Sequence, residues 1–220
     1  LPPLPIREEL HDTIEILRKL GDAKAALGKL QGRSAVIPNQ GLLINTISLQ
    51  EAKVSSKIEN IFTTNYELSR EFSDNNNESN GASKEVLRYR EALWSGFNYL
   101  KTTKRFDQQY FIRVFQEIKQ TKDSIRPSFI QLTIKQGGTG PNAGQVVYTP
   151  PRNQEIIQDR IKNLIEFVNN DEKYPIDYLL KMAIAHYQFE AIHPFFDGNG
   201  RTGRIILLLY LIASRTVRIV

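Results

Sequence analysis

With 220 residues, of which 40% are hydrophobic and 24% charged, the chain has the composition of an ordinary globular protein rather than a disordered or fibrous one. It has no apolar run of the roughly 20 residues that a membrane span needs, and from its first residues we expect no signal peptide. The lack of cysteine excludes disulfides and thiolate metal sites and fits a cytoplasmic location. The net charge of +5 comes from scattered rather than striped Lys and Arg, which argues against a nucleic-acid role.

The first third of the chain is predicted to be helical. Apolar residues at helical spacing predict a helix over residues 6–30, which Gly21 and Gly28 weaken and could divide in two. A second helix is predicted over 42–60. Small polar residues over 73–83 then predict a mobile loop or a domain seam.

The remainder of the chain adds more helices and one hairpin. Alternating residues over 128–135, a glycine-rich turn and a short apolar run over 145–148 predict two antiparallel strands. Helices are predicted over residues 84–101, 107–120, 151–169, 175–190 and 202–214. The fold class is therefore mainly α with one hairpin, divided into an N-terminal helical region (1–72) and a core (84–220).

The loop before the last predicted helix has the features of an anion site. Gly198, Asn199 and Gly200 lie immediately ahead of the helix, where free backbone N–H groups and the helix dipole favour phosphate. Arg201 and Arg204 follow at a spacing that places both on one face, and arginine binds phosphate oxygens in a bidentate manner. This stretch therefore predicts a phosphate cradle.

Two further residues of the same loop add chemistry to the cradle. Asp197 is a single carboxylate beside it, and Mg²⁺ is commonly held by one carboxylate together with phosphate and water oxygens. His193, with an ordinary pKa near 6.5, could accept a proton from an attacking hydroxyl. A lone histidine is more often packed and a lone arginine more often solvated, but a base, a metal ligand and cations together within twelve residues favour nucleotide chemistry.

The segment from His193 to Arg204 matches the signature H-x-F-x-[D/E]-G-N-G-R-x-x-R at all eight fixed positions, and the chain therefore resembles the Fic family. The resemblance implies the Fic fold, a helical bundle with one β-hairpin flap, preceded here by an N-terminal helical region. It also implies a protein adenylyltransferase, which transfers AMP from ATP to a Ser, Thr or Tyr hydroxyl with Mg²⁺ as cofactor. Doc-like kinases differ near the Gly-Asn-Gly-Arg stretch, whereas phosphocholine transfer stays open.

The resemblance assigns a role to each residue of the motif. His193 would be the general base, Phe195 a buried anchor and Asp197 the ligand of Mg²⁺. Gly198, Asn199 and Gly200 would form the anion hole, with the Asn side chain reaching phosphate. Arg201 and Arg204 would bind the β- and γ-phosphates.

The hairpin over 130–148 resembles the family's flap, which pairs with the target's backbone as an added strand. The target-binding residues would be Gln145, Val146, Val147 and Tyr148. The alternative is a hairpin that simply covers the core.

A second motif lies late in the helix predicted over 42–60. Ser55 and Glu59 are four residues apart and share a helix face, an arrangement that ordinarily means a solvated glutamate. With Asn60 they match the family's inhibitory pattern [S/T]-x-x-x-E-[G/N]. The resemblance then implies that Glu59 pairs with Arg204 and keeps basal activity low, and that Glu59 could also orient water to remove AMP again.

Two other functional hypotheses are open beside the enzyme. One is a module that binds nucleotide without transfer, against which the intact His193 and Asp197 argue, and the other is a toxin–antitoxin-like regulator. His11 is predicted to lie at the surface and His186 to be structural. Expected partners are ATP and a protein substrate along the flap, with self-modification and a homodimer left open. Because the chain lacks an initiator Met and resembling proteins often continue into a winged-helix region, we expect it to be a piece of a longer protein.

Overall fold

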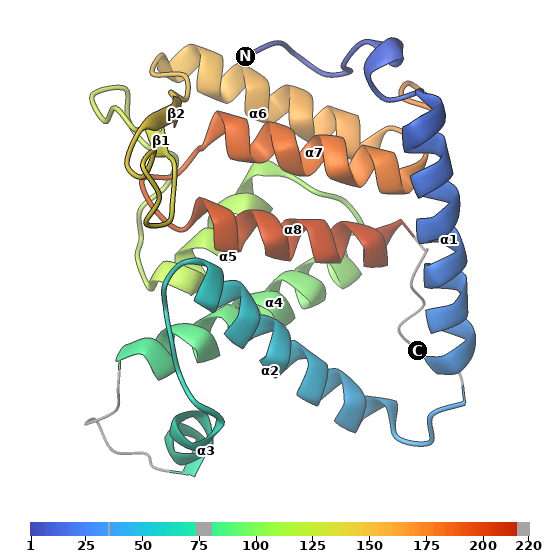
Figure 1. The fold of residues 1–220 in the computed structure, drawn as a ribbon, viewed down its shortest axis with the longest axis vertical. Coiled ribbons are helices and arrows are strands. Elements are labelled where there is room, and N and C mark those ends of the chain that lie inside the picture. Colours follow the sequence, from blue (N-terminus) through green and yellow to red (C-terminus); the bar gives the residue numbers. More distant parts are fainter. Residues whose placement is uncertain (35, 74–80, 215–220) are drawn as a thin grey trace.

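The computed structural model describes residues 1–34, 36–73 and 81–214 (Figure 1). A short 3₁₀ turn, Glu8–Leu10, precedes the first α-helix. The α-helices of the described residues are α1 (Ile14–Ser34), α2 (Gln40–Ile58), α3 (Asn65–Ser73), α4 (Gly81–Thr103), α5 (Gln108–Lys119), α6 (Gln154–Asn169), α7 (Tyr178–Ile192) and α8 (Asn199–Ala213). Strands β1 (Ile134–Lys135) and β2 (Val146–Tyr148) form an antiparallel hairpin. The prediction of a mainly α fold with one hairpin is confirmed.

The core is built around α8, which packs against α7, α4, α5 and α2. Figure 1 shows α6, α7 and α8 in succession, with α4 and α5 lying beyond α8. Helix α5 illustrates how the sequence directs this packing, because Asp107 caps its start by accepting the N–H of Tyr110, and Gln120 ends it in a left-handed conformation. Its apolar residues recur at helical spacing and form one buried face, made of Tyr110, Phe111, Ile112, Val114, Phe115 and Ile118.

The N-terminal helices are held to this core very differently. Helix α2 packs against α4 and α8, and α3 packs against α4. Helix α1 stands along one side of the molecule in Figure 1, and none of its residues is buried. An ion pair between Lys24 of α1 and Asp177 at the start of α7 connects the two. Among the described residues, no helix combines the length and apolarity that crossing a membrane requires.

Several predicted boundaries were wrong. The helix predicted over 6–30 begins only at Ile14 and runs unbroken to Ser34. The strand predicted over 128–135 is reduced to Ile134–Lys135, where the pairing register is irregular. Helix α3 was not predicted, although a capping box marks its start: Thr64 and Glu67 exchange side-chain to backbone hydrogen bonds of 2.7 and 3.1 Å. Residues 74–80 of the predicted polar loop lie outside the described residues.

Candidate active site

The motif loop connects two packed helices and turns sharply at both ends. Helix α7 ends at Ile192, and His193 takes up a left-handed conformation (φ 50°) with its N–H donated to the carbonyl of Phe189. Gly198 is also left-handed (φ 74°), a conformation that glycine adopts without strain, and Asn199 begins α8 directly after it. The loop therefore presents the N-terminus of α8, with its free N–H groups, beside the imidazole.

Phe195 and Asn199 hold this loop to the core. The Phe195 ring is fully buried and stacks on Phe115 with ring centroids 4.1 Å apart. The Asn199 amide accepts the N–H of Phe195 at 2.9 Å and donates to its carbonyl at 2.8 Å. The sequence analysis expects the Asn199 side chain to reach phosphate, and in this structure its buried amide closes the loop on Phe195.

Arg126, which the sequence analysis missed, ties the same loop to the hairpin. Its side chain is 2% exposed. The guanidinium donates to the carbonyls of His193 (2.8 Å), Ile130 (3.2 Å) and Pro151 (2.5 Å), and the backbone N–H donates to Pro194 (2.9 Å). No local pattern marks this residue, because every partner is a backbone carbonyl brought close only by the fold.

The environment of His193 favours a neutral imidazole. Burial lowers its pKa, and the positive charge of Arg126 lowers it further, whereas the backbone carbonyl of Glu190 and the negative charges of Glu59 and Asp197 act in the opposite direction. The Nδ1 atom lies 3.2 Å from the carbonyl oxygen of Glu190, which can only accept a hydrogen bond. In the neutral ring Nδ1 is thus the donor, and Nε2 is free to accept a proton.

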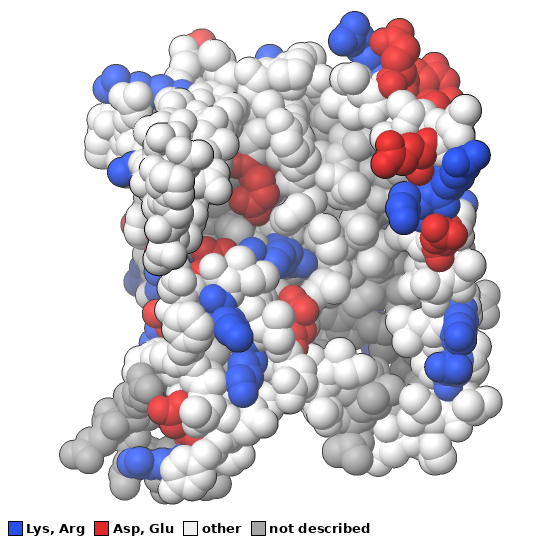
Figure 2. Space-filling model, in the orientation of Figure 1, with Lys and Arg blue, Asp and Glu red and all other residues white. Residues whose placement is uncertain are grey.

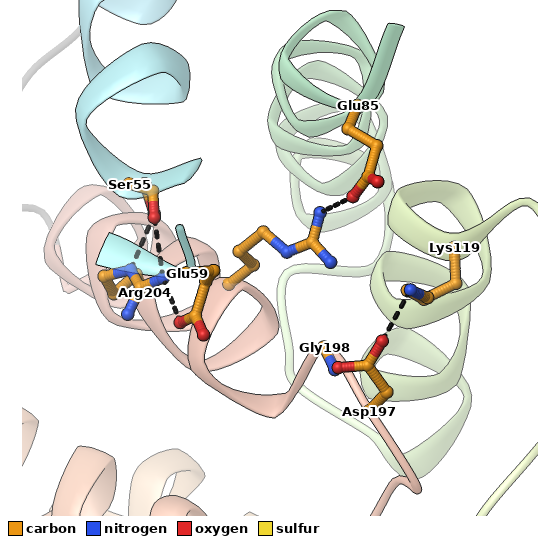
Figure 3. Close-up of polar contacts among 8 residues, drawn as sticks. Ser55, Glu59, Glu85, Lys119, Asp197, Gly198 and Arg204 are labelled. Carbon is orange, nitrogen blue, oxygen red and sulfur yellow. Dashed lines mark hydrogen bonds and ion pairs between the residues drawn. The ribbon is translucent and has the colours of Figure 1, made fainter. Parts of the chain in front are cut away.

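Arg204 is held by residues from the end of α2, as Figure 3 shows. Its Nε donates to Oγ of Ser55 at 2.6 Å, and Nη2 donates to the Ser55 carbonyl at 3.0 Å and to Oε1 of Glu59 at 2.7 Å. A Cβ placed on Gly200 would collide with Oε1 of Glu59, so the carboxylate lies directly over the start of α8. Asn60 follows in a left-handed conformation (φ 60°), which glycine and asparagine tolerate best.

The other charged residues of the loop also form ion pairs. Their partners lie on α4 and α5, which the sequence analysis did not connect to the loop. Arg201, only 3% exposed, contacts Oε2 of Glu85 on α4 at 2.7 Å. Asp197 contacts Nζ of Lys119 on α5 at 2.6 Å and accepts the N–H of Gly198 (Figure 3). Burial acts to raise the pKa of Asp197, but the hydrogen bonds from Lys119 and Gly198, together with the positive charges of Lys119 and Arg201, outweigh it and lower that pKa. Each charge of the cradle therefore has an internal counter-charge.

A magnesium ion suits the position of Asp197. Within residues 1–34, 36–73 and 81–214, no three His, Cys, Asp or Glu side chains cluster closely enough to hold a metal ion. A single carboxylate with phosphate and water oxygens is nevertheless a common way of binding Mg²⁺. The Asp197 side chain is 56% exposed at the edge of the cradle, which fits that chemistry.

The hairpin stands next to the motif loop in Figure 1. Its strands pair Ile134 with Tyr148 and Lys135 with Val146. Within the described residues β2 has no strand on its other side. Of the four residues predicted to bind a target, Gln145, Val146 and Val147 are exposed and Tyr148 is partly buried.

Of the two remaining histidines, His186 lies beside the motif residue Gly203 and His11 lies in the N-terminal segment. The ring of His186 packs beside Gly203, where burial lowers its pKa. His11 is only partly exposed, at the end of the 3₁₀ turn.

Two sequence profiles match the chain: "Fic/DOC family N-terminal" over residues 17–98 and "Fic/DOC family" over residues 104–211. The chain belongs to the Fic/DOC family. The second match contains the whole motif loop, and the first contains Ser55, Glu59 and Asn60.

Solved structures agree on the fold. A fragment of Fic-1 from Caenorhabditis elegans superposes with a TM-score of 0.65 at 18% identity, covering 92% of this chain and 60% of that one. A Fic family protein from Desulfovibrio desulfuricans gives 0.68 at 22% identity, covering 96% and 59%.

Curated relatives match over a shorter stretch. "Protein adenylyltransferase fic-1" of Caenorhabditis elegans is 38% identical over 64 residues, which are 29% of this chain and 13% of that protein. "Probable protein adenylyltransferase aq_aa38" of Aquifex aeolicus is 37% identical over 67 residues, or 30% of this chain and 20% of that protein. The matched stretches thus span a fifth or less of these relatives.

Proposed function

We propose that this Fic/DOC protein transfers AMP from ATP to a hydroxyl of a protein. The observation that carries the proposal is the position of His193, whose pKa burial lowers, at the end of α7 on the loop that leads into the start of α8. A module that only binds phosphate would not need a base there. The names of the curated relatives, protein adenylyltransferases, support the same activity.

In the proposed reaction the residues of the chain position and stabilise rather than react covalently. The triphosphate lies over the N-terminus of α8, where Arg201 and Arg204 neutralise its charge once they leave Glu85 and Glu59. Nε2 of His193 takes the proton of the target hydroxyl, whose oxygen bonds to the α-phosphorus while the bond to the β-phosphate oxygen breaks, so that pyrophosphate leaves. Bound Mg²⁺, held by Asp197, would supply further charge stabilisation to the phosphates.

The end of α2 would act as a brake on this reaction. Glu59 occupies Arg204 and covers Gly200, which are the groups that a triphosphate needs. ATP bound beside it would be displaced, and a misplacement of about 1 Å can lower a rate on the order of 100-fold. Low basal activity is therefore expected while the contact between Glu59 and Arg204 persists.

The protein substrate would dock along β2. This strand has only β1 as its neighbour among the described strands, and Val146 and Val147 are 55% and 63% exposed. An extended segment could therefore add to the hairpin through backbone hydrogen bonds.

The test uses ATP labelled at the α-phosphate, with Mg²⁺, and follows label on protein for the wild type, Glu59→Gly and Glu59→Gly/His193→Ala. We expect on the order of 100-fold more label in Glu59→Gly than in the wild type, and loss of that gain when His193 is removed. Lys57→Gly is the matched control, because it loosens the last turn of α2, directly before Glu59, at an exposed residue for which no contact with Arg204 is seen among the described residues.

Each outcome of this experiment has one meaning. Label that rises in Lys57→Gly as much as in Glu59→Gly would attribute the effect to a loosened helix and overturn the brake. A Glu59→Gly protein that binds ATP yet places no label on any protein would overturn AMP transfer in favour of simple nucleotide binding.

A further inference from the structure

Arg126 is unusual because it is a buried cation without a carboxylate partner among the described residues. The side chain is 2% exposed, and burial lowers its pKa. Its hydrogen bonds go to backbone carbonyls alone: those of Ile192 and His193 where α7 passes into the motif loop, Ile130 where the hairpin segment begins, and Pro151 where it ends. One guanidinium thus connects the candidate base with both ends of the flap segment.

We propose that Arg126 is a positioning residue, which fixes the flap and the imidazole of His193 as one unit so that a hydroxyl of a strand docked on β2 is presented to Nε2. This inference rests on the proposed AMP transfer, because it supplies the alignment between target and base. The backbone of the target would be placed by the flap, and its hydroxyl must then lie within hydrogen-bond distance of the ring. Because Arg126 bonds to both the flap segment and the motif loop, the folded chain itself would set the distance between that hydroxyl and the ring.

The geometry demands arginine rather than any cation. The planar guanidinium has donors that diverge, and here they reach three segments of backbone: Nε bonds to His193, Nη1 to Ile130, and Nη2 to Pro151 and, at 3.5 Å, to Ile192. The ammonium of a lysine is a single point charge and cannot satisfy carbonyls that lie on separate segments. The backbone N–H of Arg126 adds a further bond, to Pro194, so both halves of the residue fix the motif loop.

Arg126 has a second, electrostatic effect on the same imidazole. Its positive charge lowers the pKa of His193, as burial does, whereas the charges of Glu59 and Asp197 raise it. Removing the charge of Arg126 would therefore raise the pKa of His193 and protonate the base at a higher pH. Lysine would retain this charge while losing the alignment, so the two effects can be separated.

The experiment uses the full chain in a Glu59→Gly background and compares Arg126→Lys with Arg126→Met. Arg152→Met is the matched control, because Arg152 also donates to a carbonyl near the hairpin, that of Ser128 at 3.0 Å, but is exposed and has no bond to the motif loop. The readouts are the NMR titration of His193, which is assignable among only three histidines, hydrogen exchange of the hairpin amides, and transfer of label from α-labelled ATP to the chain itself.

We expect both Arg126 variants to transfer label about 10- to 100-fold more slowly, with a KM for ATP that changes less than about twofold, because Arg126 has no bond to the phosphate cradle. Hairpin amides should exchange faster in both. Only Arg126→Met should raise the pKa of His193 and move the acidic limb of the pH–rate profile to higher pH. Arg152→Met should change none of these.

The inference is overturned if folded Arg126 variants match Arg152→Met in rate, in hairpin exchange and in the His193 titration. If Arg126→Met does not fold, Arg126→Lys decides alone, through a slower rate at an unchanged His193 pKa. Absence of label in Glu59→Gly with Arg126 intact would sink the proposed function instead, and the titration and exchange data would then still show whether Arg126 couples the flap to His193.

Discussion

The motif loop and the end of α2 meet at the same cradle, but they are held there in different ways. The loop is fixed by buried groups: Phe195 is 0% exposed and the Asn199 amide is 2% exposed with both of its ends bonded. The carboxylate that α2 contributes is open to solvent, with the Glu59 side chain 37% exposed and that of Arg204 21% exposed. The cradle is thus fixed to the core by buried contacts, whereas the Glu59 carboxylate that covers it is held by an ion pair at the protein surface.

This difference bears on how a brake can be released. Ion pairs between solvent-exposed side chains are worth about 0.2–1 kcal/mol, so the strength of the pair between Glu59 and Arg204 does not by itself account for a brake. Figure 2 shows positive and negative side chains intermixed on the face where α2 meets α8 in Figure 1. Position therefore matters more than strength: Glu59 acts because it lies over Gly200, where a small displacement of the α-phosphate is enough to slow the reaction.

The largest expected effect concerns the motif loop, which buried contacts fix to the core. Phe195→Ala should lower the free energy of unfolding by about 3–5 kcal/mol, because it leaves a cavity beneath the loop and removes the stack on Phe115. Phe196→Ala is the adjacent control, since that ring is 41% exposed and should cost less than about 1 kcal/mol. The test is urea unfolding of both variants. Equal losses in the free energy of unfolding would mean that the loop is not anchored by Phe195.

The motif loop could be foreseen because its residues are contiguous, so one short window of sequence contains the base, the cradle and both arginines. The long helices could be foreseen from their periodicity, and the hairpin from alternation around a glycine-rich turn. Helix α3 was overlooked although Thr64 and Glu67 signal its start, since a helix of nine residues is too short to give a clear periodicity.

The partners of the motif loop could not be foreseen in the same way. Arg126 lies 67 residues before His193, Lys119 lies 78 before Asp197, and Glu85 lies 116 before Arg201. Each is one charged residue on an otherwise ordinary segment; the packing of α4 and α5 against α8 brings Glu85 and Lys119 to the loop, and the segment after α5 brings Arg126 there. Glu59 was predicted because a family pattern exists for it, and no general physical rule would have selected it.

A second prediction concerns Glu190, a carboxyl on the buried side of the same site. Burial raises its pKa to about 7, with the charge of Arg204 acting to lower it and that of Glu59 to raise it. Because the folded pKa exceeds the unfolded value, this group makes the protein less stable as pH rises from about 4.5 to about 7. Glu190→Gln has no such dependence, so its stability relative to the wild type should grow by about 3 kcal/mol over that range.

Denaturant unfolding at a series of pH values measures this effect, and repeating it in Glu59→Gly sharpens the comparison. Loss of the Glu59 charge should lower the pKa of Glu190 and shift the destabilisation to lower pH. If the curve were unchanged in Glu59→Gly, the carboxylate of Glu59 would not be seated over the cradle in solution.

The smallest expected effect separates the contribution of Ser55 to the brake from that of Glu59. Ser55→Ala removes the hydroxyl that accepts from Nε of Arg204 at 2.6 Å but leaves Glu59 in place. One such hydrogen bond contributes about 1 kcal/mol, so basal transfer of label should rise about three- to fivefold, well below the effect of Glu59→Gly. Ser56→Ala is the control, because Ser56 is equally buried and its Oγ has no partner among the described residues. If label rose as much in Ser55→Ala as in Glu59→Gly, the brake would depend on the hydrogen bonds to Arg204 rather than on the carboxylate over Gly200. If the two serine variants had equal rates, Ser55 would have no part in the brake.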